Sequence, residues 1–223
     1  MPQTETEEDF LNLEEEEGLF EAPKKMDFQN ITINKTKKMI LPMYIFGQPV
    51  LRKVAEEIDY EAYPNLKELI DNMFETLKRS EGVGLAAPQV GLSIRLFIVD
   101  LDVISDDEPQ YKGYLHAFIN PEILEESKET SSMSEGCLSI PGINENVKRP
   151  EKIHVAYTDE NGEKQDKWLE GFEARVFQHE YDHLDGKMFI DHLSPLRKQM
   201  IKSKLLAMAK GKFSAHYKCK PNR

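Results

Sequence analysis

Residues 178–183 read Q-H-E-Y-D-H and contain the spacing H-E-x-x-H, the most informative stretch of this 223-residue sequence. Side chains four positions apart lie on one face of an α-helix, so His179 and His183 can bind the same metal ion. Glu180 projects beside them and can reach a water molecule at that metal. Two imidazoles leave a divalent ion short of ligands, so another part of the sequence must supply the third.

The third ligand is absent from the position that metzincins use, ten residues after the first histidine, where this chain has Phe189. His192 lies beyond the expected helix and would need a different geometry. The better candidate is Cys137, in the segment E-G-C-L-S at residues 135–139. A free cysteine is usually a small buried hydrophobe. Beside an incomplete H-E-x-x-H, however, a thiolate completes a Cys-His-His site that leaves one position open for water.

A third stretch, residues 82–89, reads G-V-G-L-A-A-P-Q. It superficially matches a dinucleotide-binding fingerprint, but it follows a predicted helix where that fingerprint requires a strand. One interpretation is a glycine turn between a helix and a strand. The other is that the glycines admit the backbone of a peptide substrate while Gln89 offers its amide to a reacting oxygen. Both interpretations remain open.

Together and in this order, the three stretches resemble those of the peptide deformylase family, which carries G-x-G-x-A-A-x-Q, E-G-C-L-S and Q-H-E-x-D-H. The resemblance covers about residues 39–210. It implies a metal-dependent hydrolase that removes the formyl group from the N-terminal formyl-methionine of newly made polypeptides and releases formate. It also implies one divalent metal ion, with Fe(II) as the physiological ion and zinc, nickel or cobalt able to replace it. Ligand chemistry alone would suit zinc.

The resemblance assigns the metal to Cys137, His179 and His183. Glu180 would take a proton from the attacking water and deliver it to the departing amine. The side chain of Gln89 and the backbone N–H of Leu138 would stabilise the negative charge that develops on the carbonyl oxygen.

An apolar pocket for methionine is expected beside the metal ligands. Phe172, Arg175 and Val176 precede the first histidine by three to seven positions and are predicted to line one wall. Arg175 would contribute its aliphatic stem, not its charge. Val83 is predicted to face them, and the backbone of Gly84 is expected to contact the substrate.

Supporting contacts are expected around the ligands. Glu135 is predicted to pair with Arg149 and so to position the cysteine segment, and Asp182 can orient an imidazole by accepting its free N–H. Gln178 is expected to be structural. No metal role is expected for the remaining histidines, which are His116, His154, His192 and His216.

The pattern of elements predicts an α+β fold, with antiparallel sheets around a central metal-binding helix and a further helix near the C-terminus. Apolar residues at helical spacing predict a first helix that begins near Pro64 and stops at residues 80–82, where Gly82 is a plausible terminator. Strands are predicted at 95–99, 117–119 and 153–157. A turn at 159–162 then leads to a return strand that contains Trp168.

The C-terminal helix, from about 195 to 210, carries apolar residues that we predict to share one broad face: Leu196, Met200, Ile201, Leu205 and Met208. Basic residues alternate with them. The simplest interpretation is an amphipathic helix packed on the domain. The alternative, by similarity to some bacterial deformylases, is that its basic face docks on the ribosome.

Residues 1–38 are expected to form an acidic, flexible extension, and residues 39–223 a single catalytic domain. The net charge of −11 argues against general nucleic-acid binding. No apolar run is long enough for a membrane span, and no secretory signal is evident. Two widely separated cysteines do not make a disulfide framework, so we expect a reducing, cytoplasmic setting.

Two other functions fit part of the pattern. A metalloprotease would use the same H-E-x-x-H chemistry on internal peptide bonds, but Cys137 and the lack of a histidine at 189 argue against it. A catalytically silent metal-binding or ribosome-associated module would have no need of Glu180 or Gln89.

Overall fold

The computed structural model describes residues 38–220, so the expectation for residues 1–38 falls almost wholly outside the described residues. Three helices are α1 (Leu66–Ser80), α2 (Gly171–Leu184) and α3 (Pro195–Ala209). The main antiparallel sheet has the order β2 (Gly84–Ala86), β3 (Leu96–Asp100), β4 (Leu115–Glu126), β7 (Lys152–Thr158) and β8 (Lys164–Glu170). A second antiparallel sheet pairs β5 (Thr130–Cys137) with β6 (Ile140–Pro150), and a short parallel sheet pairs β1 (Met43–Tyr44) with β9 (Cys219–Lys220).

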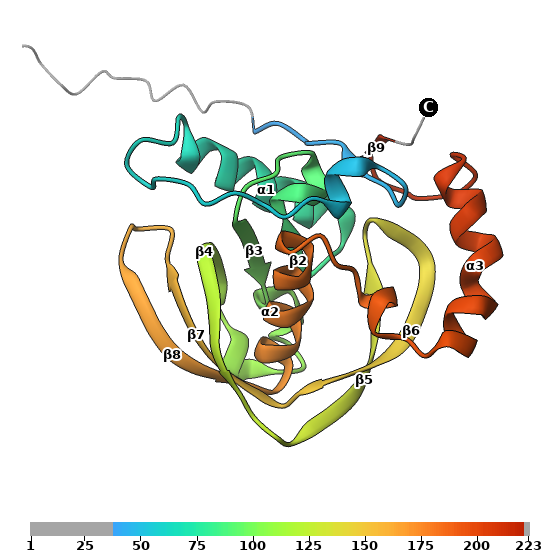
Figure 1. Cartoon of the computed structure of the whole chain (residues 1–223). Coiled ribbons are helices and arrows are strands. Elements are labelled where there is room, and N and C mark those ends of the chain that lie inside the picture. The colour runs from blue at the N-terminus through green and yellow to red at the C-terminus, as the bar shows by residue number, and fades with distance from the viewer. Residues whose placement is uncertain (1–37, 221–223) are drawn as a thin grey trace, which may run out of the picture. The chain divides into compact units, whose positions relative to one another are not determined.

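Helix α2 lies at the centre, between the five-stranded sheet and the β5–β6 hairpin (Figure 1). This arrangement confirms the predicted α+β fold, with antiparallel sheets around the metal-binding helix and a further helix near the C-terminus. The small β1–β9 sheet is the exception, because its two strands run parallel. It joins the first described strand to the last.

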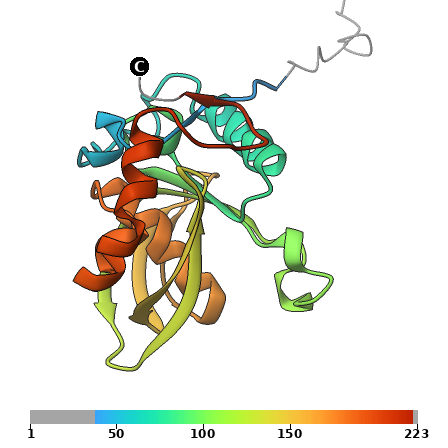
Figure 2. The same ribbon diagram turned by 90° about the vertical axis from the view of Figure 1, so that its right-hand side faces the viewer.

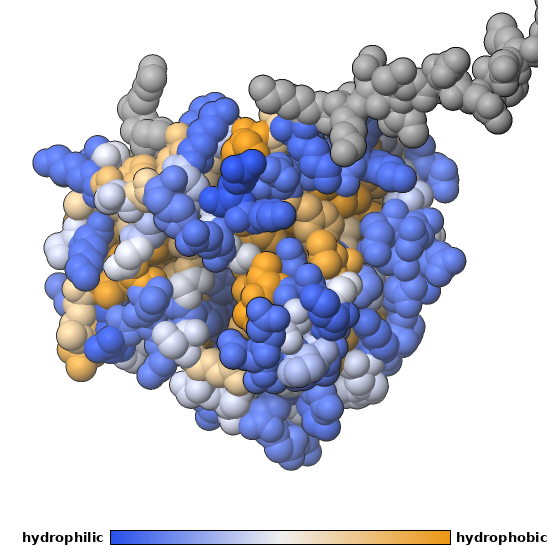
Figure 3. All heavy atoms as spheres, turned by 180° about the vertical axis from the view of Figure 1, so that it is seen from behind, coloured by the Kyte–Doolittle hydropathy of each residue, from blue (hydrophilic) through white to orange (hydrophobic). Residues whose placement is uncertain are grey.

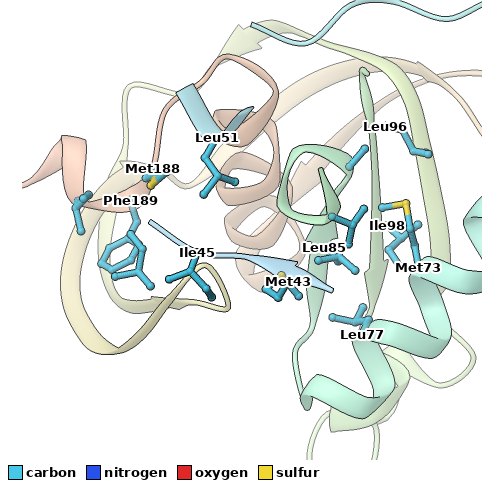
Figure 4. Close-up of a cluster of buried hydrophobic side chains, with 14 of the residues drawn as sticks. Met43, Ile45, Leu51, Met73, Leu77, Leu85, Leu96, Ile98, Met188 and Phe189 are labelled. Atoms are coloured by element: carbon cyan, nitrogen blue, oxygen red, sulfur yellow. The ribbon is translucent and has the colours of Figure 1, made fainter. Parts of the chain in front are cut away.

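Strand β3 is buried on both faces and separates two apolar clusters. Leu96 and Ile98 belong to one cluster, while Phe97 and Val99 belong to the other, as the alternation of side chains along a strand requires. The first cluster packs residues from α1, β1 and the segment after α2 against the sheet, as Figure 4 shows. The second packs α2 against the opposite face.

The predicted first helix is present, and Leu66, Ile70, Met73 and Leu77 are buried as their spacing indicated. The predicted start near Pro64 is two residues too early, whereas the predicted stop at residues 80–82 is confirmed, because the last helical residue is Ser80. The helix starts at Leu66, after Asn65 in the left-handed conformation (φ 54°), so Pro64 lies outside it. At the other end the left-handed residue is Glu81 (φ 57°) and not Gly82.

The β7–β8 hairpin forms as predicted. Gly162 turns the chain with a φ of 84°, and its N–H donates to the carbonyl of Asp159 at 3.1 Å. The β5–β6 hairpin was not predicted. Its buried positions include Glu135, Glu145 and Arg149, so charged side chains hide the period-two pattern that would mark the strands.

The prediction of one broad apolar face on α3 is wrong. Ile201 and Met208 are 6% and 3% exposed, whereas Leu196 and Met200 are 71% and 60% exposed. At about 100° per residue, Leu196 and Met200 lie on average roughly a third of a turn from the stripe formed by Ile201, Leu205 and Met208. Only the latter stripe packs on the domain.

The surface on the side opposite to the view of Figure 1 is mostly hydrophilic, with apolar side chains gathered in recesses (Figure 3). None of the helices within residues 38–220 has both the length and the apolar character that crossing a bilayer requires.

Candidate metal centre and substrate pocket

Helix α2 carries two histidines on the face that it turns toward the β5–β6 hairpin. The rings of His179 and His183 lie 5.4 Å apart between centroids, and His183 is fully buried. The helix is held against the sheet by Phe177, whose ring meets those of Phe97 and Phe118 edge to face at 5.0 and 5.2 Å. The histidines therefore project from a firmly packed element.

The third candidate ligand stands at the end of β5. The ladder between β5 and β6 shifts register between Gly136 and Cys137, where the chain turns tightly into β6. This turn brings the thiol to the two imidazoles, and the ligand atoms of Cys137, His179 and His183 all lie within 4.8 Å of one another.

The spacing of these atoms fits a metal ion. The Cys137 Sγ and the His183 Nε2 are 3.3 Å apart. Ligands at ordinary zinc–sulfur and zinc–nitrogen bond lengths, in a tetrahedral arrangement, lie about 3.5 Å apart. Burial opposes ionisation of the thiol, but the neighbouring imidazoles outweigh it and lower the pKa of Cys137 to about 5. A thiolate is the form that binds a metal.

Glu135 orients one imidazole. Its Oε2 accepts a hydrogen bond from the His179 Nδ1 at 2.9 Å, which leaves the Nε2 of that ring directed toward Cys137. The predicted pair with Arg149 is confirmed, with two hydrogen bonds of 2.7 and 2.9 Å. The contact between Glu135 and His179 was not predicted. A signal for it was present, because Glu135 and Cys137 are two positions apart on one strand and so share the face that meets the metal ligands.

Asp182 orients the imidazole of His192, which is not one of the candidate metal ligands. It accepts hydrogen bonds from His192 at 2.7 Å and from Arg149 at 2.8 Å. The orienting role foreseen for Asp182 therefore falls on a histidine outside the metal centre. Gln178 is structural as expected, because its side-chain amide donates to the carbonyls of Pro150 and Ala174.

Glu180 is buried beside the ligands and is only 4% exposed, so it is not a solvent-facing helix acid. Its Oε2 has no hydrogen-bond partner among the described residues. Burial, opposed in part by the imidazoles, raises the pKa of Glu180 to about 7. A Cβ atom at Gly84 would stand 2.4 Å from the Glu180 Oε1, so glycine there admits this carboxylate.

Gln89 lies in the short 3₁₀ helix Ala87–Val90 and points its amide at the cysteine. Its Oε1 accepts the backbone N–H of Ala86 at 2.8 Å, and this fixes which end of the amide faces the site. Its Nε2 then lies 3.4 Å from the Cys137 Sγ and 3.3 Å from the Ser139 Oγ. Leu138 occupies the turn between β5 and β6.

A cavity of about 450 Å³ opens onto Cys137, His179 and Glu180. All the residues predicted for its walls line it, namely Val83, Gly84, Phe172, Arg175 and Val176. The guanidinium of Arg175 points into the protein, where it donates to Glu135, to Ser131 and to the carbonyl of Val147. Residues 214–217, which were not predicted to belong to the pocket, also line the cavity.

Of the remaining histidines, His154 and His116 make contacts away from this centre. His154 stacks on Trp168 and contacts Asp166, and His116 lies near Glu160. Among the described residues, the only group of three or more histidine, cysteine and acidic side chains with metal-binding spacing is the Cys137 site.

A model of the polypeptide deformylase family matches residues 40–199. The peptide deformylase of Christiangramia forsetii is 48% identical over 192 residues, which cover 82% of this chain and 97% of that protein. The peptide deformylase of Flavobacterium psychrophilum is 49% identical over 189 residues, with the same coverage of 82% and 97%.

Solved structures agree with the sequence relatives. The peptide deformylase of Thermotoga maritima has a TM-score of 0.63 and 44% identity, covering 70% of this chain and 99% of that one. The peptide deformylase of Legionella pneumophila has a TM-score of 0.68 and 36% identity, covering 78% and 98%. With a matching sequence, fold and Cys-His-His site, this chain belongs to the peptide deformylase family.

Proposed function

We propose that this protein is a peptide deformylase that removes the formyl group from the N-terminal formyl-methionine of new polypeptides and releases formate. The observation that carries the proposal is the convergence of Cys137, His179 and His183 beside the buried carboxylate of Glu180, within one cavity. Those groups are what hydrolysis of an amide at a metal centre requires.

The metal would be held by the Cys137 thiolate and the two imidazoles. The chemistry that a divalent cation would supply there is polarisation of the formyl carbonyl and a pKa for a water molecule lowered toward neutrality. Glu135 would support the site by keeping the Nδ1 of His179 protonated, so that the other ring nitrogen is free for the metal.

Glu180 would act as the proton carrier. Its carboxylate would accept the proton of the water that attacks the formyl carbon, and would then deliver that proton to the departing amine nitrogen. Burial suits this role, because it raises the proton affinity of the carboxylate toward the neutral range.

Gln89 and Leu138 would stabilise the carbonyl oxygen as it gains negative charge. The Nε2 of Gln89 already faces the cysteine, and the N–H of Leu138 belongs to the peptide group that follows that cysteine. Loss of one such donor raises an activation barrier by about 2.7–4 kcal/mol.

The methionine side chain would occupy the apolar part of the cavity. Phe172, Val176 and Val83 are all among its lining residues. Contacts to the substrate backbone would come from Gly84 and its neighbours. Such contacts would accept varied sequences after the methionine.

The function is tested by formate release from formyl-Met-Ala-Ser. Wild-type protein should release formate, whereas Glu180→Gln should lose about 10²–10⁴ of kcat. Glu68→Gln, on the exposed side of α1, is the matched control and should behave as wild type. Absence of formate release from metal-loaded wild type, or cleavage of an internal peptide bond instead, would overturn the proposal.

We propose Fe(II) as the physiological metal, with zinc, nickel or cobalt able to occupy the same ligands. Protein loaded with iron or nickel is expected to be clearly more active than the zinc form. The measurement is kcat/KM of chelated protein reconstituted anaerobically with each metal, normalised to bound metal. Equal activity of all forms would contradict this expectation.

We also propose that the enzyme works in the cytoplasm on chains emerging from ribosomes, and that exposed basic residues of α3 contact the ribosome. Arg197 is engaged by Glu145, which leaves Lys202 and Lys204 exposed for such a contact. The double variant Lys202→Glu/Lys204→Glu should lose ribosome co-sedimentation while keeping its activity on free peptides. Lys67→Glu/Lys78→Glu, at exposed positions on α1, is the charge-matched control, and unchanged binding of the first double variant would remove the ribosome from the proposal.

A further inference from the structure

Residues 210–220, here called the C-terminal strap, follow α3 and lie beyond the part of the chain that the family model matches. Figure 2 shows the strap leaving the end of α3, crossing toward α1 and returning to β9. Residues 213–220 read F-S-A-H-Y-K-C-K, and the odd-numbered positions are half-buried while the even-numbered ones are exposed. This alternation is that of an extended segment with one face on the protein.

The far end of the strap is fixed by β1. The N–H of Met43 donates to the carbonyl of Lys218 at 2.8 Å, and the side-chain amide of Gln48 donates to the carbonyl of Lys220 at 3.1 Å. Phe213, Tyr217 and Cys219 pack against the first apolar cluster. The strap is therefore joined to the domain by both backbone pairing and apolar contact.

The middle of the strap borders the catalytic cavity. Ser214, Ala215, His216 and Tyr217 line the same cavity as Cys137 and Glu180. His216 also lies 3.7 Å from Glu81, the residue that follows α1 and that lines this cavity too. The strap thus closes a side of the cavity that neither α2 nor the β5–β6 hairpin covers.

Tyr217 connects the strap to the turn that follows the cysteine. Its hydroxyl donates to the carbonyl of Leu138 at 2.7 Å. The carbonyl of Ser139, the other residue of this turn, accepts the N–H of Phe46 at 2.8 Å. Both carbonyls of the turn are thus held by segments outside the hairpin, and the orientation of Leu138 depends on them.

We infer that the strap is part of the active site and that Tyr217 is a positioning residue for the peptide N–H of Leu138. The inference rests on the proposed function, in which that N–H donates to the carbonyl oxygen of the substrate. A donor aimed at developing charge must be held in place before the reaction, because small displacements reduce catalysis steeply. The Tyr217 hydroxyl supplies that restraint from a segment distant in sequence.

The test is Tyr217→Phe in the full chain, which removes one hydroxyl and keeps the packed ring. We expect kcat on formyl-Met-Ala-Ser to fall about three- to tenfold with little change in KM, as for an interaction that matters mainly in the transition state. Bound metal per chain should stay at the wild-type value. Tyr63→Phe is the matched control, since Tyr63 packs on the same cluster and its hydroxyl has no hydrogen bond to the described residues.

Three results decide the outcome. A lower kcat with unchanged metal content, seen in Tyr217→Phe and not in Tyr63→Phe, supports the inference. Wild-type kcat in Tyr217→Phe, with or without a lower Tm, overturns it and assigns the tyrosine a structural role only. Loss of bound metal in parallel with activity also overturns it, because the hydroxyl would then support the metal centre and not the Leu138 donor.

The failure of this inference is distinguishable from failure of the proposed function. If wild type releases formate, Glu180→Gln does not, and Tyr217→Phe matches wild type, the function stands and the strap has no positioning role. If the wild-type protein itself releases no formate, the proposed function is overturned, whatever Tyr217→Phe does.

Discussion

Glu180 is a carboxylate in an environment that disfavours its charge. It is buried among the two histidines and the cysteine, and its Oε2 has no hydrogen-bond partner among the described residues. A buried, unpaired acid reduces stability unless it is protonated. The same environment gives a general base a proton affinity useful near neutral pH. At this position the requirements of stability and catalysis therefore oppose each other.

Burial of the charged Glu180 carboxylate is unfavourable, so the free energy of unfolding of metal-free protein should depend on pH. Because the folded pKa is about 7, above the ordinary 4.5, the stability associated with protonated Glu180 is complete below pH 4.5 and is lost as the pH rises through about 7. Chelated Glu180→Gln should therefore gain stability relative to chelated wild type between pH 5 and pH 8, by up to about 3 kcal/mol. Urea unfolding at both pH values measures it. A difference between the two proteins that does not change with pH would contradict the expectation.

Helix α2 is the element on which the site depends, because it supplies two ligands, the proton carrier and one wall of the cavity. It is fixed on one side by the aromatic contacts of Phe177 with β3 and β4. On the other side, Glu135 and Arg149 of the hairpin bond to His179 and Asp182. The ligand geometry thus follows from how the helix is packed.

Removal of the aromatic anchor should loosen both the fold and the metal centre. Phe177 is 1% exposed, so Phe177→Ala should reduce the free energy of unfolding by about 3–5 kcal/mol and weaken metal binding. Trp168→Ala, at a side chain that is 51% exposed on β8, should have a much smaller effect on both. Denaturant unfolding and competition with a metal-binding dye measure the two effects. Wild-type metal affinity in Phe177→Ala would show that the packing of α2 does not control the site.

Across the whole described molecule, a buried ionic network joins segments that are far apart in sequence. Arg149 on β6 bonds to Glu135 on β5 and to Asp182 on α2, and Asp182 also bonds to His192. Burial would raise the pKa of Glu135, but the hydrogen bonds from Arg149 and His179 outweigh it and hold that pKa well below its usual range. The network therefore ties the hairpin to the central helix only while its acids are charged.

This network should determine the acid stability of the protein. Since the folded pKa values of Glu135 and Asp182 are lowered, their contribution is present above about pH 4.5 and is lost as the pH falls below it. Arg149→Met should cost about 3–5 kcal/mol at pH 7, because it removes the buried guanidinium that pairs with both carboxylates, and should flatten this acid dependence.

The control for that variant is Arg79→Met, which breaks the exposed pair with Glu75 on α1 and should cost under about 1 kcal/mol at either pH. Guanidinium unfolding of both variants at pH 4 and pH 7 makes the comparison. An Arg149→Met protein as stable as Arg79→Met would mean that the network contributes no net stability.

Much of the fold could be predicted because local patterns decide it. The first helix follows from the spacing of Leu66, Ile70, Met73 and Leu77, and the β7–β8 hairpin from its turn at Gly162. The β5–β6 hairpin could not be found in this way. Its inward positions are occupied by charged residues whose partners lie on other elements. A pattern of alternating hydrophobic residues therefore does not mark these strands.

By itself, the sequence determined the kinds of donor available and the helical spacing that sets His179 and His183 on one face. These are local properties of residue type and backbone geometry. Only the tertiary structure decided that Cys137 meets the histidines, that Glu135 orients one of them, and that Gly84 admits the carboxylate of Glu180. The same is true of Tyr217, which is 79 positions from Leu138 and yet bonds to it. The physical reason is that such contacts depend on the packing of segments remote in the chain, which no local pattern of residues encodes.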